Sequence, residues 1–165
     1  MPMNQESLMY TVKLAGALSA GICMGLGAIG SSIGIGGTAK GALAGIARQP
    51  KVASELTKTM LIGQAITESP AIFALVTAIL LVFIDVKNTS MPHLFAIIGA
   101  GISMGLGALG PGIGDGLASE VACEGVARVP EEKSNLMRVM LIGQATAQST
   151  SVYAFVVSLC LLYIT

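Results

Sequence analysis

Four long apolar stretches constrain this chain more than any other feature of its sequence. They cover residues 14–39, 59–84, 94–114 and 139–165, and Glu68 is the single charged residue within them. A helix that crosses the hydrocarbon core of a bilayer needs about 20 apolar residues. Only 11% of the chain is charged, against about a quarter of a soluble domain. Too little polar sequence remains to cover such helices in water, so we predict an all-α membrane protein with four transmembrane helices.

The second half of the chain repeats the first at a constant offset. Three pairs of blocks share this offset: ICMGLGAIGSSIGIGG (22–37) with ISMGLGALGPGIGDGL (102–117), ARQP (47–50) with ARVP (127–130), and MLIGQAITES (60–69) with MLIGQATAQS (140–149). An uninterrupted repeat indicates a duplicated structural unit. Because each unit holds two spans, both units have the same orientation in the membrane. We therefore expect two tandem hairpins, in residues 1–85 and 93–165, joined by a linker at 86–92.

A proline in each hairpin turn separates the expected helices. We predict helices at about 10–46 and 53–84 in the first hairpin, and at about 93–126 and 134–164 in the second, because the residue before a proline disfavours helix. Basic residues gather at these turns: Arg48, Lys51, Lys58, Arg128, Lys133 and Arg138. Cytoplasmic loops of membrane proteins are enriched in Lys and Arg. We therefore expect the hairpin loops to be cytoplasmic and both termini to lie on the opposite side.

Glycine is concentrated in the first and third expected helices, whereas the second and fourth carry bulky residues. Gly37, Gly41 and Gly45 recur at every fourth position of the first helix. Small residues at this spacing let helices approach closely in lipid. Pairing a narrow helix with a wide one gives a wedge, and wedges assemble into a ring with helices 1 and 3 inside and helices 2 and 4 outside. A compact monomeric bundle with scattered glycines is the alternative.

Glu68 is the strongest candidate for a functional residue. A carboxylate near the middle of a membrane span is costly unless it is protonated, binds a cation or has a partner. No basic residue lies within the four apolar stretches. This pattern is typical of a group that takes up and releases a cation. The alternative is a structural Glu that hydrogen-bonds to a neighbouring helix.

The second hairpin has Gln148 at the position of Glu68, but it also has Asp115 where the first hairpin has Ile35. Glu68 and Gln148 each follow their turn proline by 18 residues, and Ile35 and Asp115 each precede it by 15. At about 1.5 Å of rise per residue, these positions lie at nearly the same depth. Asp115 is therefore expected to supply the carboxylate that Gln148 lacks, unless it only caps or packs beside the glycines.

These motifs together resemble the c subunit (proteolipid) of rotary F-type ATP synthases. The Gly-rich helix ending in ARQP, followed by GQAxxES and an apolar run, carries the resemblance twice over nearly the whole chain. The fused duplication is similar to the proteolipids of V-type ATPases. The resemblance implies a non-catalytic rotor-ring subunit in a multi-pass integral membrane complex, expected in a prokaryotic cytoplasmic membrane. Its implied partners are further copies of itself in a ring, a stator a subunit, central-stalk subunits and membrane lipid.

The resemblance also assigns roles to individual residues. Glu68 matches the ion-binding carboxylate of the family, and Ser69 and Ser149 match the next position, which supplies a hydroxyl ligand in some members. In the family, the site lies between neighbouring outer helices. The resemblance implies that one such site here combines Asp115 and Gln148 with Ser69 and the backbone near Ile66. In this site the inner helix supplies the carboxylate and the outer helix supplies the amide, which is the reverse of the family's arrangement. The polar turns match the stalk-contacting loop and contain Arg48, Gln49, Pro50, Arg128 and Pro130.

The transported ion is expected to be H⁺, with Na⁺ as the alternative. Ile35 leaves the Glu68 site with few oxygen ligands, which favours H⁺, whereas the nearby hydroxyls and amides suit Na⁺. No cofactor is expected, because no glycine-rich phosphate loop with a lysine is present. The net charge of zero argues against a nucleic-acid partner. A small proton-coupled secondary transporter or channel is the alternative function.

Overall fold

The computed structural model describes residues 5–84 and 91–164, and within these ranges it contains helices and no strands. The elements in order are α1 (Gln5–Arg48), η1 (Pro50–Val52), α2 (Ala53–Thr67), α3 (Ser69–Val82), α4 (Met91–Arg128), η2 (Pro130–Glu132) and α5 (Lys133–Ile164). Four helical segments are long and apolar enough to cross a membrane: Glu6–Arg48, Pro50–Val82, Met91–Arg128 and Pro130–Tyr163. The predicted four-helix class is therefore confirmed. Most of the predicted linker lies outside the described residues, and its last two positions, 91 and 92, begin α4.

The two hairpin turns have the same backbone conformation. Gln49 has φ −136° and ψ 81°, and Val129 has φ −135° and ψ 78°. Each precedes a proline that opens a short 3₁₀ turn. The proline ring disfavours the α region at the preceding residue, so α1 and α4 both end there and the chain reverses. At the turns, the duplication seen in the sequence is thus also a duplication of backbone structure.

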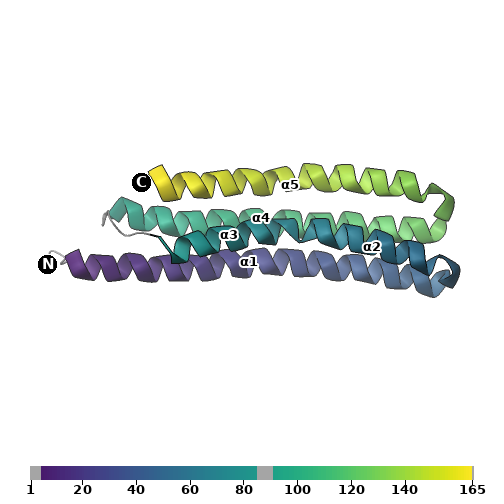
Figure 1. Ribbon diagram of the computed structural model, residues 1–165, viewed down its shortest axis with the longest axis horizontal. Helices are drawn as coiled ribbons and strands as arrows, with labels where there is room; N and C mark the ends of the chain where they lie inside the picture. Colours follow the sequence, from purple (N-terminus) through teal and green to yellow (C-terminus); the bar gives the residue numbers. More distant parts are fainter. Residues whose placement is uncertain (1–4, 85–90, 165) are drawn as a thin grey trace.

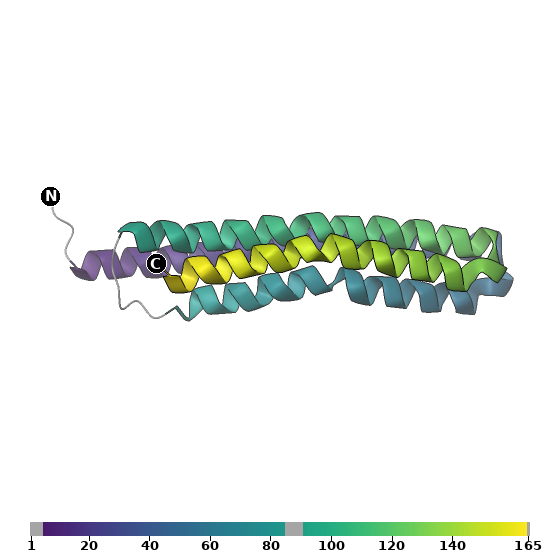
Figure 2. The same cartoon turned by 90° about the horizontal axis from the view of Figure 1, so that it is seen from above.

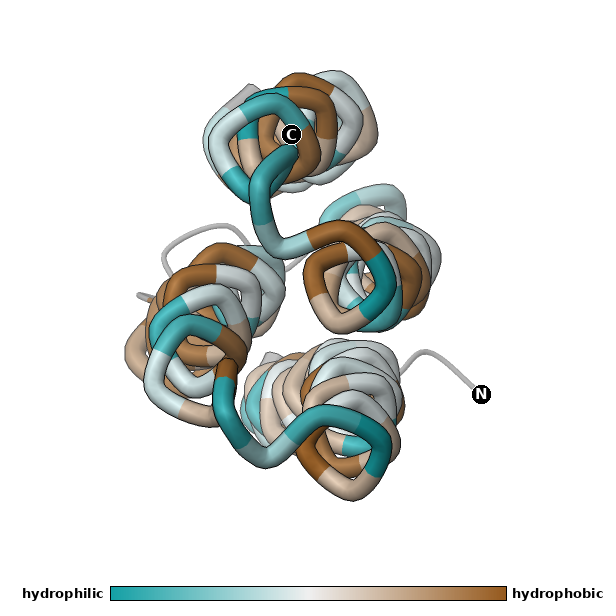
Figure 3. The backbone as a smooth tube through the Cα atoms, turned by 90° about the vertical axis from the view of Figure 1, so that its right-hand side faces the viewer, coloured by the Kyte–Doolittle hydropathy of each residue, from teal (hydrophilic) through white to brown (hydrophobic). Residues whose placement is uncertain are grey.

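The helices form an open arrangement in which α5 stands apart (Figures 1 and 3). The most extensive packing is between α1 and α4, and α2 and α3 lie against both of them. Helix α5 packs mainly on α4. Only 17% of the most apolar window of α5 is buried, against 39–44% in the other three spans. One chain therefore leaves the faces of α4 and α5 uncovered.

Helices α1 and α4 approach each other through glycines, as the sequence predicted. A Cβ atom at Gly30 would lie 2.5 Å from the backbone oxygen of Leu109, and one at Gly41 would lie 2.5 Å from that of Glu120. Real Cβ atoms do not come this close to a carbonyl. The absence of a side chain at these positions therefore sets the distance between α1 and α4.

The second span is divided at Glu68, where a continuous helix was predicted (Figure 2). Pro70 has no N–H, so it cannot donate to the carbonyl of Ile66 four residues earlier. The helix ends at Thr67, and α3 begins at Ser69 with Pro70 in its first turn. The second hairpin has Thr150 in place of Pro70, and α5 runs through this level without a break.

Gly30→Ala and Gly36→Ala form a matched pair that tests the α1–α4 contact. Alanine favours helix over glycine by about 1 kcal/mol, but at Gly30 its Cβ would strike the α4 backbone, whereas Gly36 faces open space. We expect Gly30→Ala to destabilise the single chain by about 1–3 kcal/mol and Gly36→Ala to leave its stability unchanged or higher. Thermal unfolding of the monomer in detergent, followed by circular dichroism, measures both. Equal melting temperatures would contradict the contact.

Candidate functional site

Glu68 lies on the outer surface of the chain, between α2 and α3. Its backbone N–H still bonds to the carbonyl of Gln64, at 3.1 Å, and its own carbonyl accepts the N–H of Ala71 at 3.0 Å. The side chain is exposed, and it forms no hydrogen bond or ion pair with any residue that the structure describes. A single chain therefore leaves this carboxylate without a partner, at a break in the helix.

Asp115 is fully buried and makes contact with Gln148, the counterpart of Glu68. The Asp115 side chain has 0% exposure, and its Oδ2 accepts a hydrogen bond from Gln148 Nε2 at 3.1 Å. The same Nε2 donates to the carbonyl of Ile66 at 2.8 Å. This is the carbonyl that Pro70 leaves without its helical donor. The common depth predicted for Asp115 and Gln148 is therefore confirmed, and the two residues meet α2 at its C-terminal end.

Gln144 forms a second polar layer one helical turn from Gln148. Its Nε2 donates to Ser119 Oγ at 2.8 Å, to the backbone oxygen of Asp115 at 3.2 Å and to that of Gly63 at 3.4 Å. The counterpart in the first hairpin, Gln64, likewise donates to the backbone oxygen of Ile35, at 3.3 Å. These amides fix the outer helices to the inner ones just beside the carboxylate level.

Two buried oxygens in this cluster accept no hydrogen bond from the described residues. They are Asp115 Oδ1 and Gln144 Oε1. A buried carboxylate is costly when its charge is not compensated. Among the residues that the structure describes, the donor to the carboxylate is the neutral amide of Gln148 alone. The arrangement therefore favours a proton on Asp115 or a small cation beside it, with oxygens of the protein as ligands.

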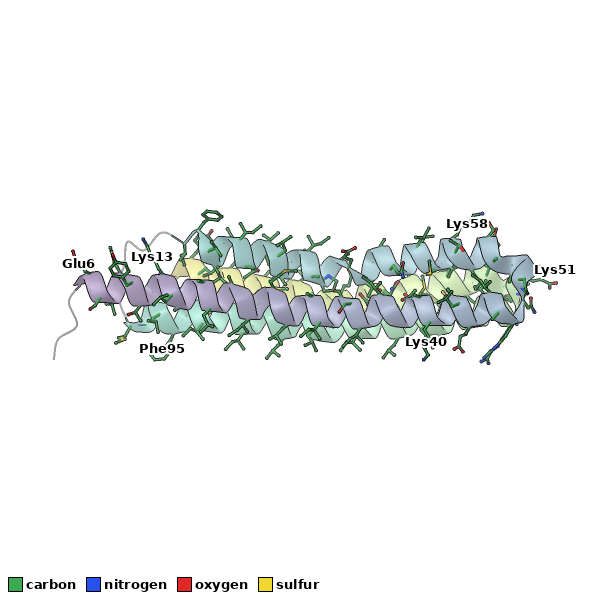
Figure 4. The ribbon with its side chains drawn as sticks, turned by 90° about the horizontal axis from the view of Figure 1, so that it is seen from below. Glu6, Lys13, Lys40, Lys51, Lys58 and Phe95 are labelled. Atoms are coloured by element: carbon green, nitrogen blue, oxygen red, sulfur yellow. The ribbon has the colours of Figure 1, made fainter. Side chains whose placement is uncertain are left out.

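The remaining predicted site residues lie near this level without joining the contact. Ser149 Oγ donates to the backbone oxygen of Thr146 at 2.6 Å, within its own helix. Ser69 is half-buried at the start of α3, and its side chain has no hydrogen bond among the described residues. The predicted loop residues Arg48, Gln49, Pro50, Arg128 and Pro130 all lie at the turn end of the molecule, where Figure 4 labels Lys51.

Sequence reasoning missed two contributors to this site. Pro70 frees the carbonyl to which Gln148 donates, and its signal was the spacing of four residues from Ile66. Ser119 was missed because its counterpart in the first hairpin is Ala39, so the repeat shows no polar residue shared at this position. Its Oγ donates to the backbone oxygen of Asp115 at 3.0 Å while it accepts from Gln144.

Comparison with known proteins agrees with the duplicated architecture. The family of ATP synthase c subunits matches the chain twice, at residues 18–81 and 98–161. The ATP synthase c subunit of Petrotoga mobilis is 43% identical over 72 residues, which are 44% of this chain and 75% of the relative. The chloroplastic c subunit of Phaeodactylum tricornutum ATP synthase is 46% identical over 68 residues, 41% of this chain and 83% of the relative. Each relative thus corresponds to one hairpin, and the chain belongs to the family of ATP synthase c subunits, with the family unit present twice in one polypeptide.

Proposed function

We propose that this chain is a rotor-ring subunit of a rotary ATP synthase or ATPase and that it carries H⁺ on two carboxylates, Glu68 and Asp115. The subunit itself is non-catalytic, and ATP chemistry takes place elsewhere in the complex. Its partners are further copies of the chain, a stator a subunit that loads and unloads the sites, and central-stalk subunits at the polar turns. The contact of Asp115 with Gln148 and the Ile66 carbonyl carries this proposal.

The distribution of open glycines supports a ring of identical chains. A Cβ atom would meet nothing within 4 Å at six positions: Gly21, Gly25, Gly36, Gly110, Gly114 and Gly143. Their counterparts in the other hairpin all face close neighbours within the chain: Gly101, Gly105, Gly116, Gly30, Gly34 and Gly63. Each glycine that faces open space thus corresponds, in the other hairpin, to a glycine against which another helix packs. The free faces of α1 and α4 therefore correspond to the faces that already pack within the chain, except that Leu117 and Val121 replace Gly37 and Gly41.

If a second copy packs on the first in the way that one hairpin packs on the other, the open glycines gain the contacts that they lack within a single chain. Hairpin 2 of one copy packs against hairpin 1 of the next, as hairpin 1 packs against hairpin 2 within the chain. This is a head-to-tail interface, and such interfaces give rings when the rotation closes. The glycine-rich helices α1 and α4 then line the inside, and α2, α3 and α5 lie outside.

The Asp115 site is complete within one chain. Gln148 donates a hydrogen bond to one carboxylate oxygen, Oδ2, and Oδ1 remains free to hold a proton. A neutral, hydrogen-bonded Asp115 is tolerated in lipid, whereas an ionised one is costly. Each site must therefore be loaded before it leaves the stator contact, and a stator arginine would favour its release.

The Glu68 site is completed by a neighbouring copy. Gln148 donates to the Ile66 carbonyl, and the repeat places Glu68 of the next copy opposite the Thr146 carbonyl, which also accepts the Ser149 hydroxyl and lies in the unbroken α5. A carboxylate cannot donate to a carbonyl, but a protonated carboxyl group can. The geometry carried over from the first site thus favours H⁺ on Glu68 as well.

The lysines and arginines at the turns orient these loops towards the cytoplasm.

Carbodiimide labelling tests the number of ion-carrying carboxyls. Wild-type rings are expected to react at two carboxyls per chain, and Glu68→Gln and Asp115→Asn at one each, because each variant removes one protonated group. Intact-mass spectrometry counts the adducts. Glu131→Gln, in the exposed second turn, is the matched control and retains two. An unchanged count in Asp115→Asn would refute the second site.

Sodium protection of the same reaction tests the ion. If both sites carry H⁺, the labelling rate at fixed pH and ionic strength is independent of Na⁺, with K⁺ as the control salt. A rate that falls as Na⁺ rises would show that Na⁺ competes for the site and would assign Na⁺ as the transported ion.

Gly110→Leu tests the interface between copies. Gly110 faces open space in one chain, whereas its counterpart Gly30 lies against the α4 backbone. We expect this variant to keep the helicity and melting temperature of the monomer but to lose the ring, as measured by native mass spectrometry in detergent. Val152→Leu is the control, because Val152 and its counterpart Ile72 are both exposed and face lipid. A Gly110→Leu ring of normal mass would contradict the head-to-tail interface. A wild-type monomer or dimer would favour a secondary transporter.

A further inference from the structure

An ion pair joins the two inner helices near the turn end. Lys40 Nζ lies 2.8 Å from Glu120 Oε1, and the side chains are 78% and 16% exposed. The two residues are counterparts in the repeat, each ten positions before its turn proline. Figure 4 shows Lys40 on the side of α1 that faces away from α2, where the ring interior would lie. The duplicated position therefore carries opposite charges in the two hairpins.

An apolar groove lies at the level of this ion pair. It has a volume of about 490 Å³ between α4 and α5, and its lining includes Leu117, Val121, Leu136, Val139, Met140 and Gly143. In the first hairpin, the counterparts of Leu117 and Val121 are Gly37 and Gly41. A Cβ at Gly37 would lie 3.0 Å from Glu120 Oε2, and one at Gly41 would lie 2.5 Å from the backbone oxygen of Glu120. The repeat places Lys40 of a second copy over Leu117 and Val121, whose side chains require a wider spacing of the inner helices here than Gly37 and Gly41 allow within the chain.

The side chains on the two faces of this interface are complementary. Within the chain, the short Glu120 side chain lies over Gly37 and its backbone lies over Gly41. Between copies, the wider gap set by Leu117 and Val121 would be filled by the long aliphatic stem of Lys40. A lysine stem packs on apolar surface while its ammonium group reaches a polar partner. Its nearest charged partner across the interface is Glu120 of the preceding copy.

We propose that Lys40 of each copy pairs with Glu120 of the preceding copy as well as with its own, so that lysine and glutamate alternate around the inner face of the ring. This inference rests on the ring proposed above. The pairing selects head-to-tail neighbours, because hairpin 2 always meets hairpin 1 and opposite charges always meet. Two adjacent copies of the same hairpin would place like charges together.

Charge reversal separates the pair between copies from the pair within a chain. Chains with Lys40→Glu carry two glutamates at this level, and chains with Glu120→Lys carry two lysines. Each variant expressed alone has like charges at every interface, and we expect its ring to dissociate into monomers at a lower temperature in dodecyl sulfate gels. Co-expressed with different tags, the two variants restore opposite charges between copies but not within them. We therefore expect mixed rings above the statistical share, with dissociation shifted back towards that of the wild type.

The outcomes distinguish this proposal from the ring itself. If the mixed sample dissociates like the single variants, or if all samples match the wild type, the pairing between copies is refuted while the ring stands. A wild-type chain that forms no ring refutes the proposed function instead. Lys51→Glu, in the exposed first turn (Figure 4), is the control for a charge reversal near the turns and leaves dissociation unchanged. Added salt screens the effect.

Discussion

The close contact of α1 with α4 is the constraint on which the rest of this structure depends. In lipid, the association of helices is driven by packing and hydrogen bonds, since water is not excluded. Glycines such as Gly30 and Gly41 let the two backbones meet. With the inner helices held at that distance, α2 and α3 lie against both of them, and Gln148 on α5 comes within reach of Asp115 and the α2 backbone. A wider spacing would separate the groups that make up the buried site.

The carboxylate level combines three departures from regular structure. Pro70 removes a helical donor, Gln148 replaces that donor from another helix, and Asp115 moves the carboxyl group to the inner helix. Unsatisfied backbone groups are costly at membrane depth unless another part of the protein compensates them. The break at Glu68 and the amide of Gln148 therefore depend on each other. The break frees a carbonyl, and the amide that satisfies it also holds the buried carboxyl.

Most of this arrangement could be predicted from the repeat. The offset aligned the turns and placed Asp115 at the depth of Gln148, since depth in a helix follows from counting residues. The break at Glu68 was not predicted, because the apolar pattern continues through Pro70 and pattern alone does not register a missing N–H. The contacts of Ser119 and Gln144 depend on how α4 and α5 rotate about their axes, which the weak sidedness of these helices does not specify. The separation of α5 from α1 is likewise a property of three-dimensional packing.

Because the two hairpins are fused in one chain, corresponding positions can carry different residues that complement each other. In a ring of single hairpins, every substitution recurs at every position, so a lysine would meet lysines and a carboxylate moved to the inner helix would move everywhere. In the fused chain, a change in one hairpin can be matched by a different change in the other. Lys40 with Glu120, and Gly37 with Leu117, are such matched differences. The exchange of carboxyl and amide between Asp115 and Gln148 follows the same logic, because it changes the second hairpin alone and leaves Glu68 of the first hairpin in place.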